Sequence, residues 1–311
     1  NVGTHTIVVT ATDGSNAAVS DTFVLTVTNT NDAPTVANAI ADASTAEDAS
    51  YSVSVSNVFA DVDTGDSCTY SMSGAPSTIT LSGTTISGTP VNANVGTHTI
   101  VVTCTDGSSA AVSDSYVLTV TNTNDAPTVT SAIADASTAE DASYSLNAAA
   151  AFTDVDSGDT LTYTMSGAPS TLSISSGTIS GTPINANVGT HTIVVTATDG
   201  SNAAVSDTFV LTVTNTNDAP TISSTAVTTA TEDAAYSYTT TAADVDVGDT
   251  VTITCTTVPT WMTCASGALT GTPTNSEVGS HSVVITASDG TASVTDSFTV
   301  TDESKKHQRA H

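Results

Sequence analysis

The stretch that decides the fold is Asn1 to Thr35, NVGTHTIVVTATDGSNAAVSDTFVLTVTNTNDAPT, which recurs without a single change at residues 187–221. A close copy starts at Asn94, with Cys104 and Tyr116 among its differences. Self-similarity at a fixed spacing is typical of tandem repeats, in which each repeat forms one structural unit. The sequence therefore predicts an array of similar domains.

The NDAP motif sets the length of one repeat. Its prolines, Pro34, Pro127 and Pro220, succeed one another every 93 residues. The spacing predicts a partial repeat 1–32, full repeats 33–125 and 126–218, a divergent repeat 219–301 and a tail 302–311. Because residue 1 falls inside a motif that recurs later, we expect the chain to be a fragment or a processed piece of a longer protein.

Within each repeat, apolar and polar residues alternate with a period of two, which is typical of half-buried strands. In the segment 98–104, Ile100, Val102 and Cys104 share one face. Turn sequences such as DTGD, TDGS and SGTP separate the alternating runs. About seven short strands per repeat predict an all-β protein, in which Ig-like Greek-key β-sandwiches form an extended array.

The charge of the chain excludes several classes of function. There are 31 Asp and Glu against 3 Lys and Arg, and the net charge is -28. A nucleic-acid binder needs cationic side chains along the phosphates, and an anionic membrane surface repels this chain for the same reason. No apolar run is long enough to span a membrane. The partners that we expect are cations, neighbouring repeats and other copies of the chain.

The alternating direction of the predicted strands sorts the acidic residues into two ends of each repeat. In repeat 33–125, Asp61, Asp63 and Asp106 fall at one end, and Glu47 falls at the other end with the linker to the next repeat. Like charges about 4 Å apart repel by roughly 4 kcal/mol at an effective dielectric of 20. A junction of two repeats therefore needs a cation. Calcium fits best because it prefers oxygen ligands, whereas zinc favours Cys and His.

The order of these motifs resembles the calcium signature of cadherins: Glu, Asp-x-Asp, Ala-x-Asp and Asn-x-Asn-Asp-x-Pro. The phrases TAEDASY, DVDSGDTLTY, SGTISGTP and LTVTNTNDAP are similar to bacterial cadherin-like and dystroglycan-type repeats of large surface adhesins. The resemblance covers nearly all of residues 1–301. It implies that calcium ions bind between consecutive domains and stiffen the chain.

Three junctions follow from the strand order and the resemblance. The first has Asn29, Asn31, Asp32, Asp61, Asp63 and Asp106, and its upper Glu would precede residue 1. The second has Glu47, Asn122, Asn124, Asp125, Asp154, Asp156 and Asp199. The third has Glu140, Asn215, Asn217, Asp218, Asp244, Asp246 and Asp289. Glu232 is the corresponding Glu of the last repeat and completes the set of candidate calcium ligands.

Two departures from cadherins predict weaker calcium binding. The linker begins with Asn where cadherins often have Asp, and Asn-Ala-Asn around Asn94 and Asn187 stands in place of the family's second acidic motif. We expect affinities of about 10⁻⁴–10⁻³ M or weaker. A simpler interpretation also stays open, in which the acids are turn residues that bond to their own backbone. Turn roles are favoured for Asp66, Asp159 and Asp249, and either role fits Asp48, Asp141 and Asp233.

The four cysteines form two candidate disulfides. Cys68 and Cys104 belong to strands that neighbour each other in such sandwiches, and Cys255 and Cys264 flank a short turn. Two disulfides predict an oxidising, extracellular setting. The alternative is four buried thiols.

One histidine position recurs in every copy, as His5, His98, His191 and His281. Each begins an inward-facing strand pattern, so we expect a structural role rather than metal binding or pH sensing. No nucleophile elbow accompanies these histidines, and a Ser-His-Asp site is not supported. Trp261 is predicted to fill the core of the last repeat.

The expected function is structural and not enzymatic: a calcium-stiffened extender of a cell-surface adhesin or extracellular fibre. One alternative is a filament subunit that assembles by strand complementation through the partial first repeat. Another is a module that binds glycans or a partner protein, with a cell-surface or glycan ligand that lies outside this fragment.

Overall fold

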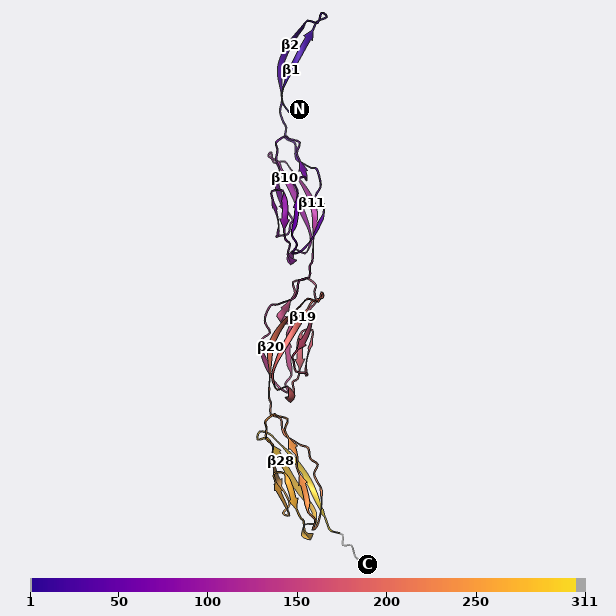
Figure 1. Ribbon diagram of the computed structural model, residues 1–311, viewed down its shortest axis with the longest axis vertical. Coiled ribbons are helices and arrows are strands. Elements are labelled where there is room, and N and C mark those ends of the chain that lie inside the picture. Colours follow the sequence, from indigo (N-terminus) through magenta and orange to yellow (C-terminus); the bar gives the residue numbers. More distant parts are fainter. Residues whose placement is uncertain (1, 306–311) are drawn as a thin grey trace, which may run out of the picture. The chain divides into compact units, whose positions relative to one another are not determined.

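A computed structural model describes residues 2–305 of the chain (Figure 1). Within this range the regular elements are β-strands and short 3₁₀ turns, which confirms the all-β prediction. Contacts divide the chain into two units, Asn1–Asp125 with Asp154–Asp159, and Ala126–Thr153 with Thr160–His311. Residues 306–311 of the predicted tail lie outside the described residues. No helix in the described range is long and apolar enough to cross a membrane.

The partial first repeat is a single hairpin of β1 (Gly3–Thr12) and β2 (Ala18–Val27). The two strands pair along their whole length, from Gly3 opposite Val27 to Thr12 opposite Ala18. No other strand of the described range hydrogen-bonds to this sheet. Both of its edges therefore lack a strand partner in the described range, and all residues of the two strands except Gly3 and Ile7 are exposed.

Repeat 33–125 is a sandwich of two sheets. Its elements are β3 (Thr35–Val36), β4 (Ala43–Ala46), β5 (Tyr51–Ser54), β6 (Phe59–Ala60), β7 (Thr69–Ser73), β8 (Ile79–Ser82), β9 (Thr85–Gly88), η1 (Asn92–Asn94), β10 (Gly96–Thr105) and β11 (Ala111–Thr121). One sheet has the order β4-β11-β10-β7 and the other β5-β9-β8, and β3 pairs with β6. β4 runs parallel to β11, while the other pairs are antiparallel.

Repeat 126–218 has the same architecture. Its elements are β12 (Thr128–Val129), β13 (Ala136–Ala139), β14 (Tyr144–Asn147), η2 (Ala149–Ala151), β15 (Phe152–Thr153), β16 (Thr162–Ser166), β17 (Leu172–Ser175), β18 (Thr178–Gly181), η3 (Asn185–Asn187), β19 (Gly189–Thr198) and β20 (Ala204–Thr214). The sheets have the orders β13-β20-β19-β16 and β14-β18-β17. Strand order is thus retained from one repeat to the next.

The last repeat keeps this plan despite its divergent sequence. Its elements are β21 (Thr221–Ile222), β22 (Thr229–Thr231), β23 (Tyr236–Thr239), β24 (Ala242–Ala243), β25 (Thr252–Thr257), β26 (Met262–Ala265), β27 (Ala268–Gly271), η4 (Asn275–Glu277), β28 (Gly279–Ser288) and β29 (Ser293–Glu303). The sheets have the orders β22-β29-β28-β25 and β23-β27-β26. β29 extends two residues into the predicted tail, because Asp302 still pairs with Gly279 through its backbone.

Each full repeat has its own hydrophobic core between its two sheets. In repeat 33–125, Ile100, Val102 and Leu118 point inward and are fully buried. Thr99 and Thr103, at the alternate positions, face solvent. The period of two in the sequence therefore corresponds to inward and outward faces of the strands.

Both predicted disulfides are confirmed. Cys68 and Cys104 are bonded, with their Cα atoms 5.2 Å apart, where β7 begins beside β10. Cys255 and Cys264 are bonded, with Cα atoms 6.2 Å apart, and connect β25 of one sheet to β26 of the other. The second disulfide therefore joins the two layers of the last sandwich.

The recurring histidines hold the 3₁₀ turns in place. Nε2 of His98 lies 2.7 Å from the backbone oxygen of Asn94, and His191 makes the same contact with Asn187. His281 contacts the backbone oxygen of Glu277 at 2.5 Å and stacks edge-on with Trp261. Trp261 in turn packs against the last core. These contacts agree with the structural roles expected for these side chains.

Candidate metal centre

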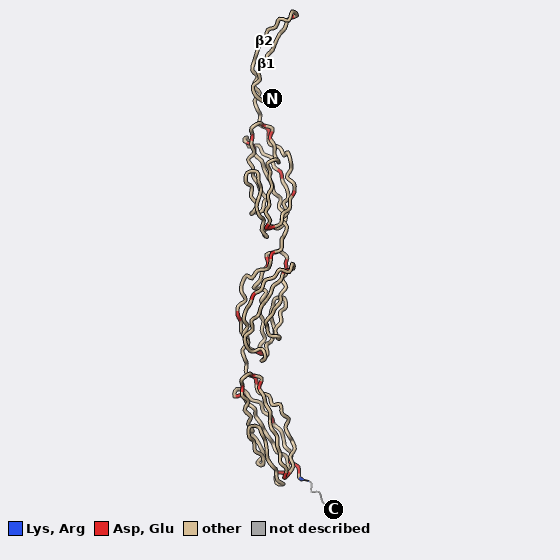
Figure 2. The backbone as a smooth tube through the Cα atoms, in the orientation of Figure 1, with Lys and Arg blue, Asp and Glu red and all other residues tan. Residues whose placement is uncertain are grey.

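Many of the Asp and Glu positions lie in loops at the ends of the sandwiches (Figure 2). Basic residues are almost absent from the chain, so no Lys or Arg within the sandwiches neutralises them. Four elements supply the acids: the turn after β4, β13 or β22, the Asp-x-Asp loop after β6, β15 or β24, the turn after β10, β19 or β28, and the linker between repeats. In each element, the backbone geometry determines where the carboxylate lies.

Glu47 is fixed by continued pairing beyond the end of β4. Its N–H donates to the backbone oxygen of Thr121 at 3.0 Å, and its Oε1 accepts the N–H of Thr123 at 2.9 Å. Glu47 is only 2% exposed, and its Oε2 is buried without a hydrogen-bond partner in the described part of the chain. Glu140 has the same surroundings, with Oε1 on the N–H of Thr216 and a buried Oε2 without a partner. A buried carboxylate oxygen of this kind needs a cation or a donor.

The residue that follows each Glu makes the turn. Asp48, Asp141 and Asp233 have φ angles of 59°, 56° and 57°, in the left-handed region that Asp tolerates better than most residues. The N–H of Asp48 donates to the backbone oxygen of Pro90 at 2.8 Å. Backbone geometry therefore accounts for these three acids, whose role the sequence left open.

The Asp-x-Asp loops fold back on themselves. The N–H of Asp63 donates to Oδ1 of Asp61 at 2.8 Å, and the N–H of Asp66 donates to the backbone oxygen of Asp63. As a result, carboxylate oxygens of Asp61, Asp63 and Asp66 lie within 4.8 Å of one another. The same grouping occurs for Asp154, Asp156 and Asp159, and for Asp244, Asp246 and Asp249. The third Asp of each loop was predicted to be a turn residue, and the structure places its carboxylate beside the candidate ligands as well.

The linker joins the Glu and the loop into one group. Asp125 donates its N–H to Oδ2 of Asp156 at 2.8 Å, and oxygens of Glu47, Asp125 and Asp156 lie within 4.8 Å of one another. In the next copy Asp218 donates its N–H to Oδ2 of Asp246 at 2.8 Å. Glu140, Asp218 and Asp246 form the corresponding group. By its contacts, the loop Asp154–Asp159 accordingly groups with residues 1–125.

The Asp after β10 or β28 is held by its own turn and by the linker. Oδ1 of Asp106 accepts the N–H groups of Ser108 and Ala110, and Oδ2 accepts Nδ2 of Asn31 at 3.0 Å. The hydrogen bond from Asn31 is the main reason that the pKa of Asp106 is lowered. Asn217 donates in the same way to Asp289 at 3.0 Å. The pKa of Asp289 is also lowered, mainly by the N–H of Ala292. Both carboxylates are thus kept ionised.

The pKa values of two of these acids are raised where several carboxylates lie close together. Burial raises the pKa of Asp218, and the charges of Asp141, Asp246 and Asp244 raise it further. Burial also raises the pKa of Asp249, together with the charges of Asp246, Asp244 and Asp289. A divalent cation would reverse this direction, because it favours the ionised form of every carboxylate around it.

Some candidate ligands do not belong to any of these carboxylate groups in the described range. Glu232 joins no carboxylate group in the described range, because its Oε1 accepts the N–H of Lys305 and its Oε2 accepts Nδ2 of Asn275, each at 2.8 Å. In the first junction, Asp32 donates its N–H to Asp63 at 2.8 Å, but no Glu is present. Among residues 2–305 the linker residues Asn29, Asn122 and Asn215 make no hydrogen bond to these carboxylates.

Two further side chains, which the sequence motifs did not indicate, also reach these loops. Asn92 donates Nδ2 to Oδ1 of Asp156 at 2.9 Å, and Asn185 donates Nδ2 to Oδ1 of Asp246 at 2.7 Å. Both belong to the Asn-Ala-Asn turns η1 and η3. The recurrence of Asn-Ala-Asn was a signal, but it did not indicate which Asn faces the next repeat.

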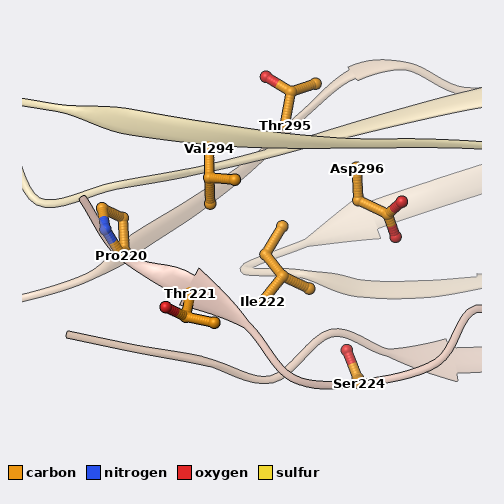
Figure 3. Close-up of a pocket in the computed structure, with 7 residues that line it drawn as sticks. All are labelled: Pro220, Thr221, Ile222, Ser224, Val294, Thr295 and Asp296. Carbon is orange, nitrogen blue, oxygen red and sulfur yellow. The ribbon is translucent and has the colours of Figure 1, made fainter. Parts of the chain in front are cut away.

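A separate surface pocket of about 370 Å³ lies in the last repeat. Figure 3 shows Ile222 of β21 and Val294, Thr295 and Asp296 of β29 around it. Asp296 is the one ionisable side chain among the residues that line it.

Several solved structures resemble this fold. Extracellular cadherin domains 1–5 of protocadherin gamma B2 match over 97% of this chain and 66% of that chain, at 18% identity and a TM-score of 0.55. Domains EC22–24 of mouse cadherin-23 match over 89% of this chain and 99% of that chain, at 20% identity and a TM-score of 0.49. The protocadherin likeness confirms the cadherin-like fold.

An endo-fucoidan hydrolase of glycoside hydrolase family 107 also matches, at 25% identity but a TM-score of only 0.33. The match covers 89% of this chain and 45% of the hydrolase, so the chain spans less than half of that enzyme. No curated protein matches the chain.

The family described as "Putative Ig domain" matches residues 33–121, 126–214 and 219–302. These three matches cover most of the chain, one for each full or divergent repeat. The chain belongs to this Ig-domain family and contains three tandem copies of its domain.

Proposed function

We propose that the chain is a structural extender of a cell-surface adhesin or extracellular fibre, in which calcium ions fix the junctions between repeats. The proposal combines a repeated sandwich with carboxylates grouped at the ends of the repeats. Tandem arrays of near-identical domains commonly set length or present many similar surfaces. Two disulfides also favour an extracellular location, because disulfides persist in oxidising compartments.

One observation carries the calcium proposal. In each of two junctions a Glu side chain is almost completely buried, and one of its oxygens has no partner in the described chain. That Glu lies within 4.8 Å of a linker Asp and of an Asp in the next loop. Turn chemistry explains the hydrogen-bonded oxygens of these acids, but it gives no reason to bury a Glu oxygen beside two other carboxylates.

The donor set fits calcium. Glu47, Asp125 and Asp156 offer only oxygen atoms, as do Glu140 and its partners, and neither group includes Cys or His. Calcium accepts such ligands in flexible geometry, and extracellular modules often bind it at about 10⁻⁴–10⁻³ M. When bound, the ion would neutralise carboxylates from a repeat, its linker and the following repeat. The protein residues position these ligands: the Thr123 N–H orients Glu47, and the Asp125 N–H orients Asp156.

Calorimetric titration with calcium tests the proposal on the whole chain. We expect binding in the millimolar range or weaker, a rise in Tm, and a narrower distribution of dimensions in small-angle scattering than in chelator. The double variant Asp154→Ala with Asp156→Ala should lose the second junction's ions and keep those of the third. Unchanged scattering and unchanged Tm on addition of calcium would contradict the proposal.

A second candidate function rests on the hairpin β1–β2. Its side chains Val9, Phe23 and Leu25 are 57%, 49% and 45% exposed, although the strands have the alternation of a core sheet. An open apolar sheet of this kind favours strand complementation by another copy, which would make a filament. Light scattering of the purified chain tests this function. Growth of assemblies with concentration supports it, and a monodisperse monomer at all concentrations rejects it.

Catalysis and glycan binding receive less support. The Ig-like and cadherin-like folds are non-enzymatic modules, and the pocket of Figure 3 has Asp296 as its one ionisable lining residue. We therefore propose that any specific recognition of a glycan or protein partner belongs to other segments of the protein.

A further inference from the structure

The 3₁₀ turns η1 and η3 each direct one Asn side chain onto the Asp-x-Asp loop of the following repeat. Asn92, the first residue of η1, donates Nδ2 to Oδ1 of Asp156 at 2.9 Å. Asn185, the first residue of η3, donates Nδ2 to Oδ1 of Asp246 at 2.7 Å. These bonds connect residues more than 60 positions apart, so they act between repeats and not within a turn.

The turn that positions Asn92 is well braced. Asn94, at its other end, is buried, and its Oδ1 accepts the N–H of Val91 at 3.1 Å and the hydroxyl of Thr78 at 2.9 Å. The backbone oxygen of Asn94 is held by His98. The two Asn residues of the motif therefore differ in role: the second builds the turn, and the first reaches the neighbouring repeat.

With the hydrogen bond from Asn92, each carboxylate oxygen of Asp156 accepts a hydrogen bond from the protein. Oδ1 of Asp156 accepts Asn92, and Oδ2 accepts the N–H of Asp125 at 2.8 Å. Both donors are neutral and both bonds go to an ionised acceptor, which makes them stronger than bonds between neutral groups. Both oxygens of Asp156 therefore have hydrogen-bond donors from the preceding repeat and its linker, and these bonds need no cation.

The last repeat shows the alternative acceptor. Asn275 is the first residue of η4 and corresponds to Asn92, but its Nδ2 donates to Oε2 of Glu232 in its own repeat, at 2.8 Å. That contact occupies the Glu oxygen which stays without a partner in Glu47 and Glu140. The Glu oxygen thus has a partner where this Asn bonds within its own repeat, and has none in the described range where the Asn bonds to the next repeat.

We propose that Asn92 and Asn185 are junction latches, which hold successive repeats together without a cation and leave the Glu oxygen for calcium. The latch itself does not depend on calcium. The second part of the inference, that the Asn sets how strongly the junction binds calcium, rests on the proposed function.

The first experiment tests the latch in chelator, on the full chain. Asn92→Ala with Asn185→Ala removes both latches, and these half-buried side chains lie outside the cores. The N–H groups of Asp125 and Asp218 bond to the same carboxylates, so their exchange with deuterium reports on the junction. Loss of one hydrogen bond to a charged group predicts roughly tenfold faster exchange. The matched control is Asn275→Ala, which should leave both amides unchanged. Equal exchange in the double variant and the control would overturn the latch.

The second experiment replaces the same residues with Asp. In chelator, Asn92→Asp with Asn185→Asp places a carboxylate against Asp156 and Asp246, so the two reporter amides should exchange at least as fast as in the Ala variant. In calcium titrations the added carboxylate should tighten binding severalfold, because affinity rises with ligand charge. Asn275→Asp serves as the control and should leave the affinity of both junctions unchanged.

The outcomes separate the two proposals. If the unmodified chain binds no calcium, the proposed function fails, while the exchange of the Ala variant in chelator still decides the latch. If the unmodified chain binds calcium and the Asp variant binds it no more tightly, the effect on calcium affinity is overturned. Faster exchange in the Ala variant together with tighter calcium binding in the Asp variant supports the full inference.

Discussion

Two regions of the molecule have the same sequence and different surroundings. Residues 1–35 and 187–221 are identical, and their hairpins pair in the same register, with Gly3 opposite Val27 and Gly189 opposite Val213. Yet Phe23 is 49% exposed, whereas the identical Phe209 is 1% exposed. The local sequence is sufficient for the hairpin and its register. The core exists only where β13 to β18 cover that hairpin.

This comparison separates local from tertiary stabilisation. An isolated two-stranded hairpin is marginal in water, and a third strand or a packed layer is needed for independent stability. In the repeat 126–218, β20 gains β13 on one edge and β19 gains β16 on the other. The stability of these strands therefore comes mainly from burial of their inner faces.

The largest effect is expected from one substitution made at both sites. Phe209→Ala should destabilise repeat 126–218 by about 3–5 kcal/mol, because it leaves a cavity in a packed core. Phe23→Ala should cost less than about 0.5 kcal/mol, because the side chain is already half exposed. Amide exchange at Ile193 and Ile7, which pair with these residues, measures each effect separately. Equal losses of stability at the two sites would contradict the burial of Phe209 and the exposure of Phe23.

The next effect distinguishes repeats with a disulfide from the one without. Reduction of Cys68–Cys104 should cost about 4 kcal/mol and that of Cys255–Cys264 about 2.5 kcal/mol, because the cost grows with the logarithm of the number of residues in the closed loop. Repeat 126–218 has Leu161 and Ala197 in place of the first pair and should be unaffected. Unfolding with and without reductant measures this difference. Intact mass should rise by roughly 4 Da on reduction, and an unchanged mass would exclude the two bonds.

A smaller effect concerns a carboxylate in a core position of the last repeat. Asp302 occupies the site of Val120 and Val213, is 1% exposed, and has no hydrogen-bond partner for either oxygen in the described range. Burial raises the pKa of Asp302, the charges of Glu232 and Glu277 raise it further, and His281 opposes this. Asp302→Val should therefore stabilise this repeat by about 1–3 kcal/mol at pH 7.

The stability contribution of Asp302 should depend on pH. Because the pKa in the folded state lies above that in the unfolded state, folding favours the protonated form. That contribution is present at low pH and is lost as the pH rises through the folded pKa. The gain from Asp302→Val should therefore shrink as the pH falls through the raised folded pKa toward the unfolded value of about 4, and should stay constant below it. Denaturant unfolding from pH 3 to pH 8 measures this, and a gain that does not vary with pH would contradict the argument.

The smallest effect is expected from a comparison of two Glu residues at equivalent positions of two repeats. Glu140 has a buried oxygen without a partner, whereas both oxygens of Glu232 accept hydrogen bonds. Glu140→Gln should abolish the stabilisation by calcium at its junction, which amounts to about 1.4 kcal/mol at a calcium concentration ten times Kd. Glu232→Gln should retain it. Tm measured in calcium and in chelator gives both values, and an equal loss in the two variants would place calcium elsewhere.

The sequence predicted most of the fold because its information is local and repeated. Alternation in segments such as 98–104 predicted strands, and the NDAP spacing predicted the number of repeats. The Cys68–Cys104 disulfide followed from neighbouring strands, and the Cys255–Cys264 disulfide followed from the short turn that the two cysteines flank. The end of β29 was harder to predict, because Asp302 suggested that the strand stops before this residue. In the structure, the backbone of Asp302 still pairs with Gly279.

The candidate site was predictable in part. The direction of successive strands was sufficient to bring Glu47 toward Asp125 and Asp156, which the structure places together. The role of Asn92 was not predictable, because it depends on how the turn η1 faces a loop of the next repeat. Asn275 shows why: the same residue type at the same position bonds to a different acceptor when its surroundings change.

The most direct measurement is a crystal structure of the chain grown in millimolar calcium, with anomalous difference density used to locate the ions. We expect one or more peaks coordinated by Glu47, Asp125 and Asp156, and equivalent peaks at Glu140, Asp218 and Asp246. Absence of density at both groups, with their carboxylates turned away from one another, would contradict it.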